Sequence, residues 1–183
     1  MAPCYAPRAT LATMTTTDLP SDLDRIARLR TTYAGLAPRV IGGEPWPLAD
    51  DFGTGPEASW GPPEVLAHLA EMLPFWLGEL ERVLTGDGSA PVPFGRLGED
   101  ATRLGSIEQG RRRPATELFA RVDAGLAAWA ARLPGLGATD LAKVGLHPRS
   151  GELTVAAMPD RFVIGHAEDH ATQLERTLVE AGR

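Results

Sequence analysis

The sequence of 183 residues contains one cysteine, Cys4, and no long uninterrupted apolar run. A single cysteine excludes an intramolecular disulfide and favours a reducing compartment. Without about 18 consecutive apolar residues, a membrane-spanning helix is excluded. The start MAPCYAPRATLATM also has no apolar stretch of the kind found in signal peptides. We therefore expect a cytoplasmic protein with no membrane partner. Met14 is an alternative start, because helical patterning begins only after it.

An excess of positive charge is absent as well. The formal net charge is −6 and the isoelectric point is about 5.2. A nucleic-acid-binding protein needs a basic face that neutralises phosphates. Arg111–Arg113 is the only dense basic run, and we interpret it as a solvated segment before a helix. The charge balance therefore argues against a nucleic-acid partner.

The length and the 43% of hydrophobic residues are enough for one well-buried core and rather short for two. We expect an N-terminal extension over residues 1–16 and a single domain over residues 17–183.

Four segments show apolar residues at helical spacing. They cover residues 18–36, 59–84 and 114–133, and a stretch from residue 154 to about residue 180. The Gly/Pro/Asp-rich passage over residues 37–58 has no period and is expected to be a long crossover loop. No long alternating strand pattern and no internal repeat is present. The sequence therefore predicts an all-α protein, a four-helix bundle with long crossover loops.

Several residues indicate where these helices begin or bend. Asp18 or Ser21 is the expected N-cap of the first helix, and Thr154 that of the fourth. Pro62–Pro63 fits a first helical turn, where missing N–H donors are tolerated. Pro74 lies inside the second helical segment and should bend it, because it removes one backbone hydrogen bond.

Two histidines, His166 and His170, lie four residues apart in the last apolar-periodic segment. Four residues turn a helix by about 400°, so both imidazoles lie on one face, about 6 Å apart along the axis. Val163, Ala167 and Leu174 fall on or near the same stripe. A packed core needs a partner for these ring nitrogens, which would be a buried carboxylate, water or a metal ion.

His68 also lies on or beside an apolar face, in the second segment. Facing helices of a bundle can combine such side chains into one site. Three neutral imidazoles with open positions are typical of a catalytic metal site. The zincin motifs are absent, because Ala167 follows the first histidine of the pair and Asp169 precedes the second. A structural or solvent-facing pair of histidines remains the alternative.

Three stretches resemble the DinB/YfiT-like family, specifically its DinB_2-type members. They are WGPPEVLAHLAEM, HPRSGELT and DRFVIGHAEDHATQLER, in this order along residues 60–176. The resemblance implies a four-helix bundle that binds a divalent metal such as zinc or nickel. It also implies His68, His166 and His170 as the metal ligands.

The same resemblance implies a metal-dependent thiol S-transferase that joins a low-molecular-weight thiol, of the bacillithiol or mycothiol type, to a small electrophile. Two alternatives stay open: a non-catalytic metal-binding stress-response protein, and a metal-dependent hydrolase. A deep pocket above the histidines, with basic groups for the carboxylates of a thiol cofactor, would favour the transferase, and an occluded site would favour the non-catalytic protein. We expect a small-molecule substrate, with a homodimer as an open alternative to a monomer.

Other polar residues receive more ordinary interpretations. Gln173 is expected either to hydrogen-bond a ligand histidine or to lie at the bundle mouth. Glu168 and Asp169 should be solvated or paired with an arginine. His147 precedes a proline and is expected to lie at the surface or to stabilise a turn. The four tryptophans are expected to anchor the core or loops rather than to form a ligand cage: Trp46, Trp60, Trp76 and Trp129.

Overall fold

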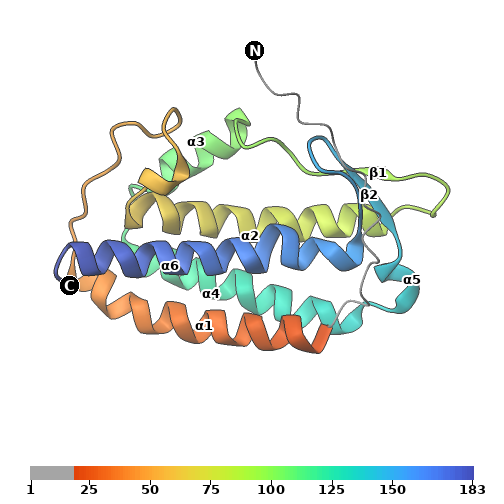
Figure 1. The fold of residues 1–183 in the computed structure, drawn as a ribbon, viewed down its shortest axis with the longest axis horizontal. Helices are drawn as coiled ribbons and strands as arrows, with labels where there is room; N and C mark the ends of the chain where they lie inside the picture. Colours follow the sequence, from red (N-terminus) through yellow and green to blue (C-terminus); the bar gives the residue numbers. More distant parts are fainter. Residues whose placement is uncertain (1–18) are drawn as a thin grey trace, which may run out of the picture.

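The computed structural model describes residues 19–183, and its main feature is a bundle of four long helices (Figure 1). These are α1 (Leu19–Gly42), α2 (Pro62–Leu84), α4 (Ala115–Arg132) and α6 (Gly165–Glu180). Helices α1 and α6 run in one direction, and α2 and α4 in the other. The predicted all-α four-helix bundle is confirmed. The expected extension over residues 1–16 and the expected cap at Asp18 lie outside the described residues.

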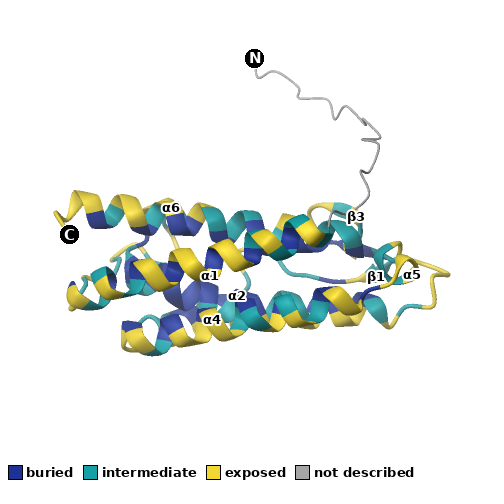
Figure 2. Cartoon of the chain, turned by 90° about the horizontal axis from the view of Figure 1, so that it is seen from below, coloured by how far each residue is buried: buried dark blue, intermediate teal, exposed yellow. Residues whose placement is uncertain are grey.

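The core lies between the helices, because each helix turns an apolar stripe inward and its polar residues outward (Figure 2). In α4 the expected stripe is buried at Leu118, Val122, Leu126 and Trp129. Each fully buried side chain of this size contributes about 1.5–3 kcal/mol of hydrophobic free energy. The bundle is therefore held together chiefly by apolar packing.

The helix ends confirm some expectations and correct others. Pro62 and Pro63 occupy the first turn of α2, as predicted. Helix α1 runs to Gly42, well beyond the predicted end, because Val40 continues its buried stripe. Ser21 lies inside α1 and is not its N-cap. Pro74 lies inside α2, and the bend expected there stays a prediction.

The fourth helix begins later than predicted. Thr154 ends a strand, and the hydroxyl group of its side chain caps no helix. After a short 3-10 turn, η3 (Val155–Ala157), the π-helical turn η4 (Asp160–Ile164) leads directly into α6. Thr154 therefore lies at the N-cap position of the first helical turn, as predicted, although its side chain makes no capping hydrogen bond.

A small sheet at one end of the bundle was not expected. Its order is β1 (Val92–Pro93), β2 (Val144–His147) and β3 (Gly151–Thr154). β1 is parallel to β2, and β2 and β3 form an antiparallel hairpin. Strands of two and four residues are too short to show an alternating pattern in the sequence.

The two crossovers also contain unpredicted helices. Helix α3 (Ala101–Gly110) lies over α2 in the connection to α4, and the short α5 (Ala138–Leu141) follows α4 (Figure 1). The connection before α2 contains the 3-10 turn η1 (Glu57–Ser59), and another 3-10 turn, η2 (Leu133–Gly135), ends α4. None of the described helices is long and apolar enough to cross a membrane.

Candidate metal centre

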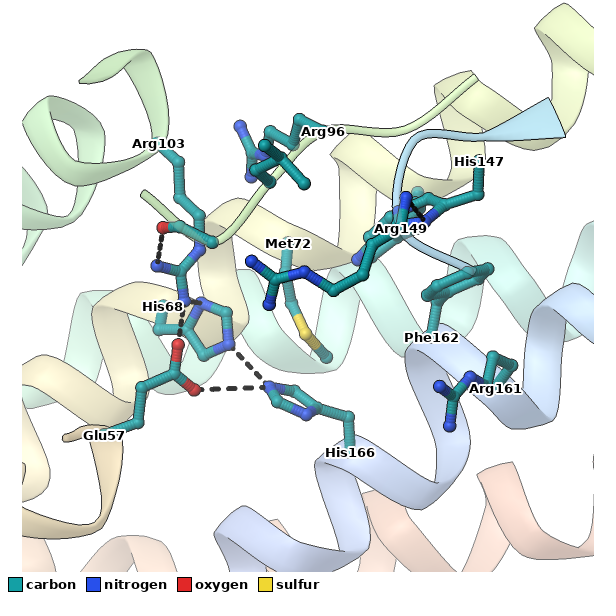
Figure 3. Close-up of a pocket in the computed structure, with 13 residues that line it drawn as sticks. Glu57, His68, Met72, Arg96, Arg103, His147, Arg149, Arg161, Phe162 and His166 are labelled. Atoms are coloured by element: carbon teal, nitrogen blue, oxygen red, sulfur yellow. Dashed lines mark hydrogen bonds and ion pairs between the residues drawn. The ribbon is translucent and has the colours of Figure 1, made fainter. Parts of the chain in front are cut away.

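The structure brings the three candidate histidines together. His68 comes from the second turn of α2, and His166 and His170 come from the first two turns of α6. The Nε2 atoms of His68 and His166 lie 2.8 Å apart, and those of His166 and His170 lie 3.1 Å apart. Figure 3 shows the rings of His68 and His166 directed toward each other. Three imidazole nitrogens therefore converge between two helices.

Two contacts fix the position of α6 beside this cluster. The buried hydroxyl of Tyr33 on α1 donates a hydrogen bond of 2.7 Å to the backbone carbonyl of Ala167, between the two histidines of α6. On the other side, the Nε2 atom of Gln173 donates to the carbonyl oxygens of Glu57 and Trp60, each at 2.9 Å. These contacts hold α6 in place against both α1 and η1.

Gln173 also determines which nitrogen of His170 carries a proton. Because its amide nitrogen donates to two carbonyls, its Oε1 atom faces the Nδ1 atom of His170 at 2.9 Å. That Nδ1 must be an N–H group, so the Nε2 atom of neutral His170 has a free lone pair. The expected hydrogen bond from Gln173 is confirmed, with His170 as its partner. The role of His170 as a metal ligand stays a prediction.

Protons alone do not satisfy the three converging nitrogens. Arg103 can only donate, so its Nη2 atom, 3.4 Å from Nδ1 of His68, leaves the proton of neutral His68 on Nε2. If Nε2 of His166 also carries a proton, two N–H groups face each other at 2.8 Å. If it does not, its lone pair faces the lone pair of His170 at 3.1 Å. A cation at the point of convergence removes this conflict once the proton of His68 leaves Nε2, because the cation then accepts electron density from all three nitrogens.

The imidazoles are in the protonation state that metal binding needs. Burial lowers the pKa of His68 well below its usual value, with further lowering by His170 and Arg103. Burial also lowers the pKa of His170 to about 4. The pKa of His166 is lowered by burial too, although the Glu57 carboxylate opposes that effect. All three rings are therefore neutral at pH 7, and each has one nitrogen with a lone pair.

Glu57 is a fourth group at the site that the sequence did not indicate. Its Oε2 atom lies 3.9 Å from Nε2 of both His166 and His170. Its other carboxylate oxygen accepts a hydrogen bond from Arg103 (Figure 3). The residue lies in η1, inside the passage that was expected to be an irregular loop. Sequence spacing cannot indicate Glu57, because no regular period links residues 57 and 166. Only the folded chain brings this loop beside α6.

The donor set fits a divalent ion of the zinc type. One ligand atom from each of Glu57, His68, His166 and His170 lies within 4.8 Å of every other. Tetrahedral zinc with bonds of about 2.0–2.1 Å needs ligand atoms about 3.3 Å apart. The separations of 2.8, 3.1 and 3.9 Å lie on both sides of this value.

A cavity of about 280 Å³ opens above the histidines (Figure 3). Buried His68, Met72 and Arg103 form its floor, and exposed Leu97 and Arg149 belong to its rim. Its lining includes four arginines, Arg96, Arg103, Arg149 and Arg161. The site is thus an open pocket with basic groups, not an occluded cluster.

The sequence profile of the DinB superfamily matches residues 8–174. The chain belongs to this superfamily. The fold agrees with the solved structure of YfiT from Bacillus subtilis, at a TM-score of 0.67 and 14% identity, over 97% of this chain and 94% of that one. YfiT is described as a probable metal-dependent hydrolase with an unusual four-helix bundle topology. No curated protein matches the sequence.

In this DinB-superfamily chain, Glu168 lies where the sequence predicts, and His147 does so only in part. Glu168 forms two hydrogen bonds of 2.9 and 2.7 Å with Arg25, as expected. His147 is buried rather than at the surface, but it does stabilise a turn. Its Nδ1 atom accepts from the backbone N–H groups of Arg149 and Ser150 at 3.2 and 3.1 Å. Burial lowers the pKa of His147, so this acceptor is neutral.

The tryptophans anchor the fold in three of four cases. Trp60 and Trp129 are buried in the core. Trp46 donates from its indole nitrogen to the carbonyl of Val40 at 2.8 Å. Trp76 instead lines the cavity, where it stacks on Phe162 with ring centroids 4.3 Å apart. One tryptophan therefore belongs to the pocket wall, which the sequence did not indicate.

Proposed function

We propose that this protein is a metal-dependent enzyme that transfers a low-molecular-weight thiol, of the bacillithiol or mycothiol type, to a small electrophile. His68, His166 and His170 hold a divalent ion, zinc or nickel, and Glu57 lies beside it. The single observation that carries the proposal is the convergence of three neutral imidazole nitrogens that protons cannot satisfy together. The open cavity above them supports an enzyme over a non-catalytic metal-binding protein.

The chemistry follows from the charges around the cavity. When bound, the divalent ion supplies positive charge that stabilises a thiolate, the nucleophilic form of a thiol. The Glu57 carboxylate is placed to accept the proton that the thiol loses. The sulfur forms a bond to an electrophilic carbon, and the group displaced from that carbon leaves with its bonding electron pair. Arg103 holds the Glu57 carboxylate in position through this exchange.

A second candidate is a metal-dependent hydrolase. It is favoured by the description of YfiT and by the carboxylate next to the histidines, which can accept a proton from an attacking water. In this case the displaced group leaves a carbonyl or related centre, and water supplies the new oxygen. The same residues serve both reactions, so the substrate distinguishes them.

The test uses protein purified without a histidine tag and loaded with zinc or nickel. Conjugation of bacillithiol or mycothiol to a chromogenic aryl halide is measured beside hydrolysis of nitrophenyl esters. Thiol conjugation that is lost in His166→Ala and reduced in Glu57→Gln supports the transferase. Hydrolysis without conjugation supports the second candidate. Stoichiometric metal with neither activity contradicts both.

A further inference from the structure

The four arginines that line the cavity fall into two pairs with different partners. Arg96 has a carboxylate partner, because its Nη2 atom lies 2.5 Å from both oxygens of Glu71. Arg103 is paired with Glu57 and also donates to the carbonyl of Gly98 at 2.8 Å. The charge of these two guanidinium groups is therefore already balanced within the protein.

The second pair, Arg149 and Arg161, is different. Arg149 lies 3.5 Å from Glu99, and both side chains are about two-thirds exposed, at 69% and 67%. Such a surface pair contributes little free energy and is easily exchanged for another anion. Within residues 19–183, the guanidinium of Arg161 forms no hydrogen bond or ion pair with another residue. Two positive charges at the rim are thus available to a ligand.

The turn that carries Arg149 is held in place. His147 accepts hydrogen bonds from the backbone of this turn, which connects β2 to β3. The His147 ring fits closely against Gly95, where a Cβ atom would lie 2.4 Å from its Cδ2 atom. Figure 3 shows the Arg149 side chain extending from this hairpin across the cavity toward Met72. The guanidinium is therefore presented to the pocket by a built turn.

The wall next to these arginines is aromatic. Phe162 follows Arg161 directly and stacks on Trp76, with the two ring planes 14° apart. His147 lies 5.1 Å from Phe162 and 6.0 Å from Trp76, measured between ring centroids. Met72 adds a flexible apolar side chain between this wall and the histidines. A flat apolar group can pack against such a wall.

We propose that Arg149 and Arg161 bind the carboxylate of a small planar acid, whose flat part packs on Trp76 and Phe162. The inference rests on the proposed function, because it names the class of electrophile that the thiol attacks. The volume of about 280 Å³ lies just below the range of about 300–1,000 Å³ of common ligand pockets, which fits a small acid. Arginine forks bind a carboxylate through two parallel hydrogen bonds.

The test measures binding without any turnover. Benzoate is titrated into metal-loaded protein by calorimetry, beside benzamide, which lacks the charge, and acetate, which lacks the ring. Benzoate should bind about tenfold more tightly than either. Arg149→Gln and Arg161→Gln should each weaken benzoate binding about tenfold, since each removes a charge-assisted hydrogen bond. Arg121→Gln, on the exposed face of α4, is the matched control and should leave binding unchanged.

Repeating the titration after removal of the metal separates this inference from the proposed function. Benzoate binding that depends on Arg149 and Arg161 with or without metal supports the subsite, even if thiol transfer is never observed. Benzoate binding that vanishes with the metal and ignores both arginine substitutions places the anion on the histidine site and overturns the inference, while the metal centre stands. Equal binding of benzoate and benzamide, or no binding, also overturns it.

Discussion

Helices α4 and α6 both pack against α1 and α2, but their buried faces differ in polarity. The buried face of α4 is apolar, and the one polar atom of Trp129, its indole nitrogen, donates to the carbonyl of Leu73 at 3.0 Å. The face of α6 contains His166, His170 and Gln173 among Ala and Leu residues. One helix therefore serves the core alone, whereas the other places polar groups in it.

The difference shows what each helix contributes. Buried polar groups cost free energy unless they are paired, whereas an apolar stripe stabilises the fold directly. In α6 the polar groups have specific partners. Tyr33 donates to the carbonyl of Ala167, and Gln173 accepts from Nδ1 of His170. A cation would satisfy the converging Nε2 atoms of the histidines. We conclude that α4 stabilises the bundle, whereas α6 carries two of the three candidate metal ligands.

The largest expected effect comes from damaging α4. Leu126→Ala should lower the free energy of unfolding by about 2–5 kcal/mol, because Leu126 is fully buried and its removal leaves a cavity. Urea denaturation gives this value. Metal content at saturation should remain that of the wild type. A loss below about 1 kcal/mol, or a loss of metal, would contradict the division of roles between α4 and α6.

The next effect is a pH dependence that arises from α6. The pKa of His170 falls to about 4 in the folded protein, against about 6.5 when unfolded. The unfolded chain therefore binds protons first as pH falls, so stability that is present above pH 6.5 is lost toward pH 4. Between pH 6.5 and 5 the metal-free protein should lose about 1.6 kcal/mol through His170 alone.

Denaturation curves at several pH values test this expectation. His170→Asn should reduce the slope of stability against pH in this window, whereas Leu126→Ala should shift the whole curve and leave the slope unchanged. A wild-type slope equal to that of His170→Asn would show that His170 is not held neutral.

An effect of similar size is expected from the partner of His170. Gln173→Leu should weaken metal binding about 10- to 100-fold, because the ring loses the acceptor that orients it. Competition with a chromogenic chelator measures the affinity. Gln173→Glu keeps an acceptor at this position and should retain more of the affinity. Unchanged affinity in Gln173→Leu would remove Gln173 from the site.

The smallest effect belongs to the exposed face of α4. Arg121 pairs with Glu117 at 3.1 Å, one turn earlier on the same helix, with both side chains exposed. Arg121→Ala should change the free energy of unfolding by less than about 0.5 kcal/mol. Urea denaturation beside Leu126→Ala checks this value. A larger loss would mean that α4 also depends on its charged face.

The sequence predicts the parts of this protein that depend on local periodicity. The stripe of α4 and the histidines at positions 166 and 170 follow from helical spacing, and His68 follows from its place on an apolar face. The resemblance to the DinB/YfiT-like family assigned all three histidines to one site. The structure brings them together, and their role as metal ligands stays a prediction.

The remaining features depend on contacts between distant segments. Glu57 reaches the histidines only because η1 folds back on α6, and β1 pairs with β2 only because the fold brings residues 92–93 beside residues 145–146. Arg103 sits on α3, which has just two buried residues, itself and Ile107, and so shows almost no apolar stripe. No spacing rule applied to the sequence detects such groups.

The most direct test of the metal centre is the response of melting temperature to metal and chelator in tag-free protein at neutral pH. A ligand of the folded state stabilises it by about 2.7 kcal/mol at one hundred times Kd. The wild type should bind one equivalent of zinc or nickel and melt at a lower temperature after chelation. His147→Ala should respond in the same way, and His68→Ala should bind no stoichiometric metal and ignore the chelator. A wild type that binds no metal and is indifferent to both additions would contradict the three-histidine site.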